Sequence, residues 1–350
     1  MVELTGLRKL LIAVVAIMLF ILALELLKKG AGGLGPFLKD TLRIHNAANT
    51  LGFGWLFAYV VLSGSPVAAI SLTFFAADQI DAVQTFAMIT GSRLGASFIV
   101  LFVGFLYFLR GHQRAASISI GILCLLVTAS VYLPAMAIGY WLLTRGVLDA
   151  VQFGTPGALT SILELIYDPI VNAVVGVVGR WPVVVFGLGM GTLLVSFNLL
   201  DRAMPELDAE RSGFERIGRL VYRPLAMFVL GMAVTSITLS VSVSLSILVP
   251  LSAKGFIRRE NTLPYIMGAN ITTFIDTLFV ALLVGGAEAF TIVLVEMLSV
   301  AAISILILLF GYNWFERSIV YLLDLIMGST RGLAVFMAVM LLVPLALLLV

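Results

Sequence analysis

Hydroxyl side chains recur at close spacing in an otherwise apolar stretch of the chain, residues 235–276. Its first part carries a serine at every second position from Ser240 to Ser246, and its second part carries the run Gly-Ala-Asn-Ile-Thr-Thr at 268–273. Serine hydroxyls and freed backbone amides can donate hydrogen bonds to an oxyanion, and hydroxyl, amide and carbonyl oxygens at a helix break can bind a cation. Non-helical backbone within a membrane is tolerated only where it is buried in protein or lines a cavity. We therefore predict that this stretch forms half of a binding site.

The composition indicates the class of protein in which this stretch lies. The chain of 350 residues is 61% hydrophobic and 11% charged, with a mean hydropathy of +1.14, whereas a soluble domain carries about a quarter charged residues. The apolar runs are too long for barrel strands, so we predict an all-α, multi-pass membrane protein. Cys124 is the single cysteine, which excludes a disulfide framework and a thiolate metal site. No constellation of histidine, cysteine or paired carboxylates suggests catalysis, so we expect neither an enzyme nor an organic cofactor.

The apolar segments of the chain repeat. They lie at about residues 7–27, 49–77, 82–109, 115–143, 183–204, 225–252, 260–286, 288–311 and 333–350. Sliding the sequence on itself by 177 positions aligns polar and small residues of the two halves, among them Ser63 with Ser240, Ser65 with Ser242, and Gly91 with Gly268. One offset that serves many positions indicates a duplication.

The segments 49–77 and 225–252 are each interrupted near the middle by serines. Corresponding interruptions in two halves point to the binding site of a transporter, so we predict two re-entrant helical hairpins with serines at their tips. That topology places 14 of the Arg and Lys residues inside and 6 outside, which satisfies the positive-inside rule with a cytoplasmic N-terminus. If both segments were plain spans, every later loop would change side. The predicted organisation is two inverted-topology repeats, 1–144 and 183–350, each with a re-entrant hairpin and a broken transmembrane helix, joined by an external connector, 145–182.

The motifs in these repeats resemble those of the type II sodium/phosphate cotransporter family, whose repeats each carry a Thr-x3-Gln-Ser-Ser-Ser hairpin motif and a later Gly-Ala-Asn-Ile-Gly-Thr-Thr-like break. The second copy here reads Thr235, Leu239-Ser240-Val241-Ser242, Pro250-Leu251 and then Gly268-Ala269-Asn270-Ile271-Thr272-Thr273. The first copy reads Ala58, Leu62-Ser63-Gly64-Ser65 and then Gly91-Ser92-Arg93, with Arg93 in place of the asparagine. Leu62 and Leu239 replace both glutamines of the motif. The resemblance therefore indicates the fold more strongly than it indicates the substrate.

The resemblance implies a sodium-coupled inorganic phosphate transporter that works by alternating access, with phosphate and sodium bound at the hairpin tips near the bilayer midplane. The substrate-binding residues it implies are Ser63, Gly64, Ser65, Arg93, Ser240, Val241, Ser242 and Asn270. The sodium ligands it implies are Thr235, Ser244, Asn270, Thr272, Thr273 and Asp276. The expected surroundings are the lipid bilayer of the cell membrane, plasma or inner. We expect sodium as the coupling ion and no nucleic-acid partner, and a homodimer is left open.

Arg93 lies about halfway along its predicted span, where an unpaired arginine costs roughly 3 kcal/mol. Its partner is either the substrate or Asp276 in the other repeat. In one interpretation Arg93 stabilises the bound anion and pairs with a carboxylate when the anion is absent. In the other, Arg93 and Asp276 form a fixed structural pair. Glu296 also lies within a span, and it fits either a proton or sodium site or a packing contact with a neighbouring helix.

Two other functions stay open at the level of sequence. Because a fold does not determine a substrate, the same scaffold could transport another small solute or anion. The chain could also be a non-transporting membrane subunit that retains the duplicated fold. Serines in membrane helices commonly bond to their own chain or to packed neighbours, but the alternation of Ser240 and Ser242 and the matching pair in the other half favour a binding site.

Overall fold

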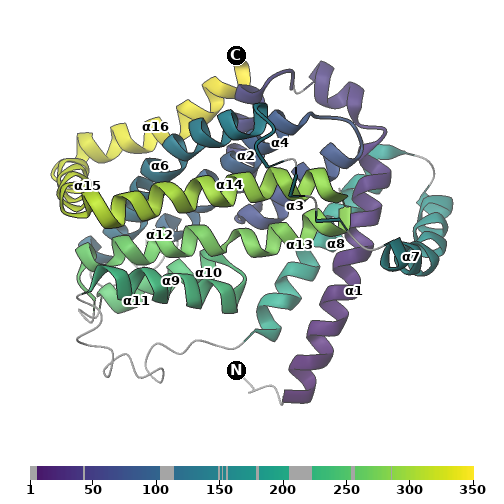
Figure 1. Cartoon of the computed structure of the whole chain (residues 1–350), viewed down its shortest axis with the longest axis horizontal. Helices are drawn as coiled ribbons and strands as arrows, with labels where there is room; N and C mark the ends of the chain where they lie inside the picture. The colour runs from purple at the N-terminus through teal and green to yellow at the C-terminus, as the bar shows by residue number, and fades with distance from the viewer. Residues whose placement is uncertain are drawn as a thin grey trace.

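The computed structural model describes residues 6–41, 44–102, 114–148, 150–151, 153–154, 157–178, 181–204, 223–253, 257–284 and 286–350. All regular structure in these ranges is helical, and they contain no strand (Figure 1). Eight helical segments within them are long and apolar enough to cross a membrane. This agrees with the predicted multi-pass, all-α membrane protein.

The helices have the following bounds. They are α1 (Gly6–Ala31), η1 (Phe37–Thr41), α2 (Ala47–Val61), α3 (Gly64–Ala76), α4 (Ala82–Ala96), α6 (Arg114–Thr144), α7 (Gly157–Val178), α8 (Pro182–Ala203), α9 (Pro224–Thr238), α10 (Val241–Ser246), α11 (Leu248–Ala253), η2 (Arg259–Asn261), α12 (Thr262–Thr272), α13 (Phe274–Val284), α14 (Gly286–Leu306), η3 (Ile307–Gly311), α15 (Tyr312–Met327) and α16 (Thr330–Leu349).

The two serine-bearing segments are interrupted at equivalent positions. Helix α2 ends at Leu62 and helix α9 ends at Leu239, and both leucines adopt the left-handed conformation, with φ of 54° and 49°. This conformation is unfavourable for residues other than glycine, so an L-residue adopts it where the surrounding structure requires it. The next residues, Ser63 and Ser240, are extended, and a second helix begins immediately after each of them. The predicted interruption of both segments is therefore present.

Equivalent glycines bring the helices of each half into close contact. A Cβ on Gly54 of α2 would lie 2.2 Å from the carbonyl oxygen of Met88 in α4, and a Cβ on Gly231 of α9 would lie 2.1 Å from that of Tyr265 in α12. The reverse contacts are equally close. A Cβ on Gly91 of α4 would lie 2.1 Å from a backbone oxygen of α2, and a Cβ on Gly268 of α12 would lie 2.1 Å from a backbone oxygen of α9. The partners of these glycines are also 177 positions apart. The pairs α2–α4 and α9–α12 thus pack alike, in the upper and lower parts of Figure 1 respectively.

Gly268 and its neighbours do not break the helix at the predicted place. Residues 262–272 are continuous in α12, and the interruption comes later, at Thr273, whose backbone stays right-handed. The physical reason is that Gly268 is needed for the close approach to α9 and not for a turn. The helix resumes as α13 at the next residue, so 259–284 is long enough to cross a membrane as one interrupted helix.

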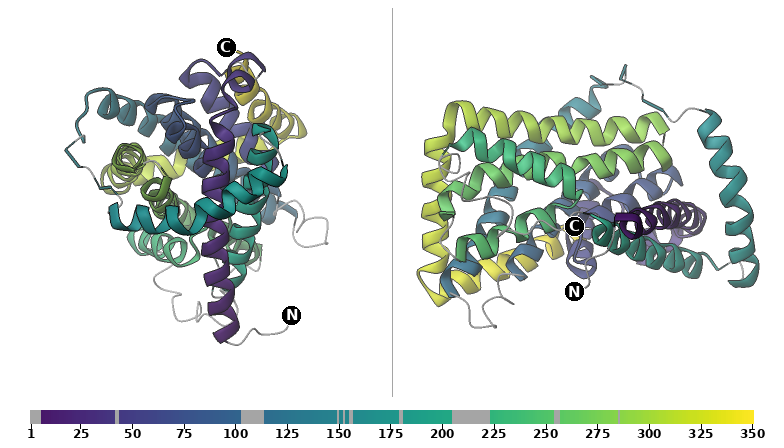
Figure 2. Two further views of the ribbon diagram at one scale, coloured as in Figure 1. Left: turned by 90° about the vertical axis from the view of Figure 1, so that its right-hand side faces the viewer. Right: turned by 90° about the horizontal axis from the view of Figure 1, so that it is seen from below.

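The segment expected to be a plain connector, 145–182, contains helix α7. This helix is 22 residues long with Pro169 inside it, and it is apolar enough to count among the candidate spans. Pro156, Pro169 and several glycines made this segment look unlike a span, but proline and glycine are tolerated within membrane helices. Figure 2 shows α7 at one edge of the molecule. It packs on α1 and α8 through a small buried cluster of Leu26, Val171 and Val185.

Several predictions about topology fall on residues that are not described. Seven of the basic residues counted for the charge bias lie outside the described ranges: Arg43, Arg110, Arg180, Arg211, Arg216, Arg219 and Lys254. The side of the membrane on which the N-terminus lies therefore stays a prediction.

Candidate functional site

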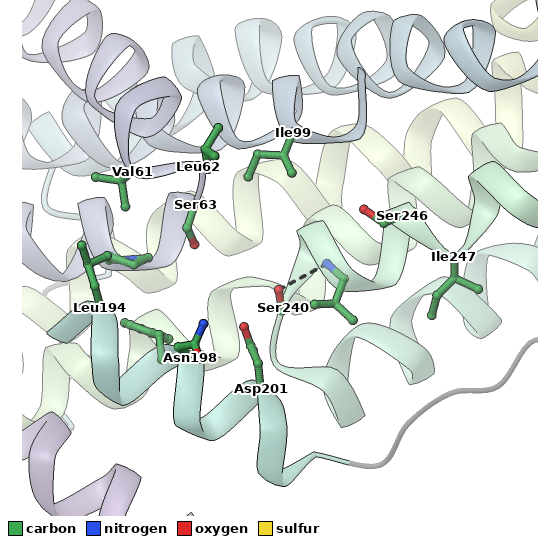
Figure 3. A pocket seen from close by; sticks show the side chains of 13 residues that line it. Val61, Leu62, Ser63, Ile99, Leu194, Asn198, Asp201, Ser240, Ser246 and Ile247 are labelled. Carbon is green, nitrogen blue, oxygen red and sulfur yellow. Dashed lines mark hydrogen bonds between the residues drawn. The ribbon is translucent and has the colours of Figure 1, made fainter. Parts of the chain in front are cut away.

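The two serine-bearing interruptions meet at one cavity of about 690 Å³. Leu62, Ser63 and Pro66 line it from the first interruption, and Ser240, Val243 and Ser246 line it from the second. Figure 3 shows Leu62 and Ser63 on one side of this space, and Ser240 and Ser246 on the other. Segments that are far apart in the sequence therefore contribute hydroxyl groups to a common cavity.

Helix α8 forms a third wall of this cavity. Leu194, Phe197, Asn198 and Asp201 line it from that helix, and Asn198 and Asp201 lie on one face because they are three positions apart. The sequence analysis did not identify either residue. The sequence does show a carboxylate, Asp201, one turn after Asn198 in an apolar segment. However, a charged residue next to Arg202 at a helix end is usually solvated, so this pattern did not indicate a site.

The two serines at the cavity differ in their hydrogen bonds. The hydroxyl of Ser240 accepts a hydrogen bond from the backbone nitrogen of Val243 at 3.3 Å, which caps α10 (Figure 3). Ser63 occupies the equivalent cap position of α3, but its side chain makes no capping hydrogen bond. The hydroxyl of Ser63 is thus available for a ligand, and the N-terminus of the 13-residue α3 adds a field that favours negative charge.

Arg93 lies in α4, within hydrogen-bonding distance of Ser65 in the first turn of α3, and is 2% exposed. Its Nη2 is 3.6 Å from Oδ1 of Asp276, so the predicted pairing between the two halves is present. Its Nη1 donates to the hydroxyl of Thr273 at 3.2 Å and to that of Ser65 at 3.5 Å, and its Nη2 donates to the hydroxyl of Thr277. The predicted residues Ser65, Arg93, Thr273 and Asp276 therefore form one buried cluster.

This cluster has unused hydrogen-bonding capacity. Within the described part of the chain, Nε of Arg93 and Oδ2 of Asp276 are buried without a hydrogen-bond partner. Buried polar atoms are normally paired, and leaving one unpaired costs about 1–3 kcal/mol. Glu296 is similar, since its Oε1 accepts a hydrogen bond from Thr90 at 2.8 Å while its Oε2 has no partner among these residues. Intramembrane charges with free capacity of this kind are typical of ligand or proton sites.

A second polar group surrounds Asn270, which is 2% exposed. Its Nδ2 donates to the hydroxyl of Thr128 at 3.1 Å, and the hydroxyl of Ser97 donates to the same oxygen at 2.9 Å. The hydroxyl of Tyr132 donates to the backbone carbonyl of Asn270 at 3.0 Å. Asn270 is thus held within the protein by α6 and lies outside the lining of the cavity.

The six predicted sodium ligands lie in separate places. The hydroxyl of Thr235 donates to that of Ser244 at 2.7 Å, and Ser244 is 2.9 Å from the hydroxyl of Tyr265. The hydroxyl of Thr272 donates to the carbonyl of Met232 at 3.1 Å. Thr273 and Asp276 belong to the Arg93 cluster, and Asn270 to the group around Thr128. Among these six residues, a hydrogen bond joins Thr235 directly to Ser244, and Arg93 contacts both Thr273 and Asp276.

The remaining predicted residues are Gly64, Val241 and Ser242. Gly64 begins α3 and packs against Ala96 and the carbonyl of Ser92, with no room for a Cβ. Val241 begins α10 and is 7% exposed. Ser242 lies in α10, but its side chain is outside the described part. Among the described residues no group of three or more His, Cys, Asp or Glu could hold a metal ion.

Comparisons of the chain with family models, with curated proteins and with solved structures found no match.

Proposed function

We propose that this protein is a sodium-coupled transporter of inorganic phosphate that works by alternating access. The observation that carries the proposal is the single cavity lined by both serine-bearing interruptions. Hydroxyl groups and the N-terminus of α3 supply the hydrogen-bond donors that a dehydrated oxyanion requires. A cavity between two interrupted segments from different halves of the chain is the arrangement on which such transporters depend.

Helix lengths support the proposed re-entrant hairpins. Helices α2, α3 and α9 contain 15, 13 and 15 residues, and a helix needs about 20 apolar residues to cross the hydrocarbon core. A pair such as α2 and α3 therefore fits a segment that enters the membrane and returns on the same side. We propose that the two halves are inverted repeats built around these hairpins, because their interruptions and their glycine contacts share one offset.

The charges of the site support coupling to a cation. Asp276 neutralises Arg93, and Asp201 adds a further negative charge at the cavity. A phosphate anion brought to such a site without a cation would be repelled, because charges interact strongly where the dielectric constant is low. Sodium that enters with phosphate would remove this repulsion, so each ligand would raise the affinity for the other.

Uptake of radioactive phosphate into liposomes containing the purified protein tests this function. We expect accumulation that follows an inward sodium gradient and falls to the level of protein-free liposomes when choline replaces sodium. Arsenate, which has the same tetrahedral shape and charge, should compete, whereas sulfate and carboxylates should not. Uptake that ignores sodium would contradict the proposal.

A different pattern of competition would instead favour a transporter of another solute on the same scaffold. The apolar side chain of Leu62 at the cavity favours this alternative, since it offers a ligand no hydrogen bond. Absence of uptake for every solute, together with a tightly bound partner protein, would favour a non-transporting subunit.

A further inference from the structure

One carboxylate, that of Asp201, faces the cavity, and the described part of the chain offers it no basic partner. Among the described residues that line the cavity, Asp201 alone is charged, and no Lys or Arg in the described part of the chain forms a salt bridge with it. In Figure 3 the side chains of Ser63, Asn198, Asp201 and Ser240 point toward the same space. Asn198 and Asp201 are both exposed residues of the cavity lining.

We propose that Asp201 binds the coupling sodium ion, with Asn198 and the hydroxyls of Ser63 and Ser240 as the other side-chain ligands. This inference rests on the proposed function and gives its cation a place and a set of ligands. The four groups offer a carboxylate, an amide carbonyl and two hydroxyl oxygens, which are the hard ligands that such cations prefer. They come from α8 and from both interruptions.

Helix direction gives the site a further preference for a cation. Asp201 lies two residues before the end of α8, Ala203, and the C-terminal end of a helix carries a partial negative charge and free carbonyl groups. The N-terminus of α3 begins at the opposite wall, beside Ser63. The end of the cavity at Asp201 therefore favours a cation, and the end at the N-terminus of α3 favours an anion. Ser63 lies between the two ligands, because its hydroxyl can offer a lone pair to the cation and donate its hydrogen to the anion.

Through Ser63 and Ser240, the bound ion would connect the two interruptions to α8. The hydroxyl of Ser63 makes no capping bond, and that of Ser240 accepts a single hydrogen bond, from Val243. Each oxygen therefore keeps a lone pair for an ion. An ion shared by both serines and Asp201 links α8 to the two interruptions and draws the walls of the cavity together. Closure around sodium would then complete the anion site.

Sodium binding to the purified full chain, measured without phosphate, tests this site. We expect sodium chloride to raise the unfolding temperature relative to choline chloride at equal ionic strength, because a ligand that binds only the folded state stabilises it. Asp201→Asn should weaken sodium binding at least tenfold, and Ser63→Ala should weaken it by a smaller factor. Glu288→Gln, which removes a negative charge from an exposed position, should bind sodium like the wild type.

The outcomes separate this site from the proposed function. A wild type that sodium does not stabilise, or an Asp201→Asn variant with unchanged sodium affinity, overturns the site even where phosphate uptake depends on sodium. Sodium binding that requires Asp201 in a protein that transports no phosphate supports the site and contradicts the function. Asp201→Glu keeps the carboxylate and controls for misfolding. It should retain more of the stabilisation by sodium than Asp201→Asn does.

Discussion

Replacing Arg93 with glutamine is expected to destabilise the protein by about 3–5 kcal/mol, because removal of one partner of a buried ion pair leaves the other charge uncompensated. The charge left behind is that of Asp276, whose side chain is 9% exposed. The substitution also removes donors from Ser65, Thr273 and Thr277. Thermal unfolding in detergent measures this effect. An Arg93→Gln variant as stable as the wild type would contradict the pairing.

A double variant distinguishes the two roles considered for Arg93. Arg93→Gln combined with Asp276→Asn removes both charges, so most of the lost stability should return, since a buried pair is often worth little relative to neutral replacements. If Arg93 also stabilises the bound anion, the stable double variant should still fail to bind phosphate. Recovery of phosphate binding together with stability would show that the pair is only structural.

Replacing Gly231 with alanine is expected to destabilise the packing of the second half. The added methyl group would lie 2.1 Å from the carbonyl oxygen of Tyr265, and backbone atoms cannot move aside without separating α9 from α12. Overpacking of this kind costs about 1–3 kcal/mol. Because Gly54 has the equivalent contact in the first half, Gly54→Ala should lower the unfolding temperature by a similar amount.

Gly191→Ala serves as the matched control for these two variants. Gly191 also lies within a helix, α8, but a Cβ there would meet nothing within 4 Å. Alanine should be neutral or slightly stabilising at that position, because it favours helix more than glycine does. Equal behaviour of the three alanine variants would mean that the glycine contacts do not hold the helices together.

Residue chemistry allowed part of this site to be predicted. A charged residue such as Arg93 within an apolar segment needs a partner, and this requirement led to Asp276 as one of two candidates, the other being the substrate. The interruptions at Leu62 and Leu239 were also predictable, because two serines separated by one residue, repeated at one offset, stand out against an apolar background.

Other parts depend on how helices pack, and a single sequence does not reveal that. The position of α8 beside both interruptions brings Asp201 to the cavity, although its sequence context is that of a helix end. The sequence also does not show where a threonine hydroxyl points, since a threonine in a helix can form a hydrogen bond with its own chain or with a ligand. Thr272 bonds to the carbonyl of Met232, which the spacing of its motif could not show. Helix α7 was missed because the prolines and glycines of its segment, among them Pro169, are typical of a loop.

The most direct test of the account is the binding of radioactive phosphate to the purified protein in sodium and in choline at equal ionic strength. The account predicts that sodium raises the affinity for phosphate, and that phosphate raises the affinity for sodium by the same factor. An affinity for phosphate that is the same in both salts would contradict it.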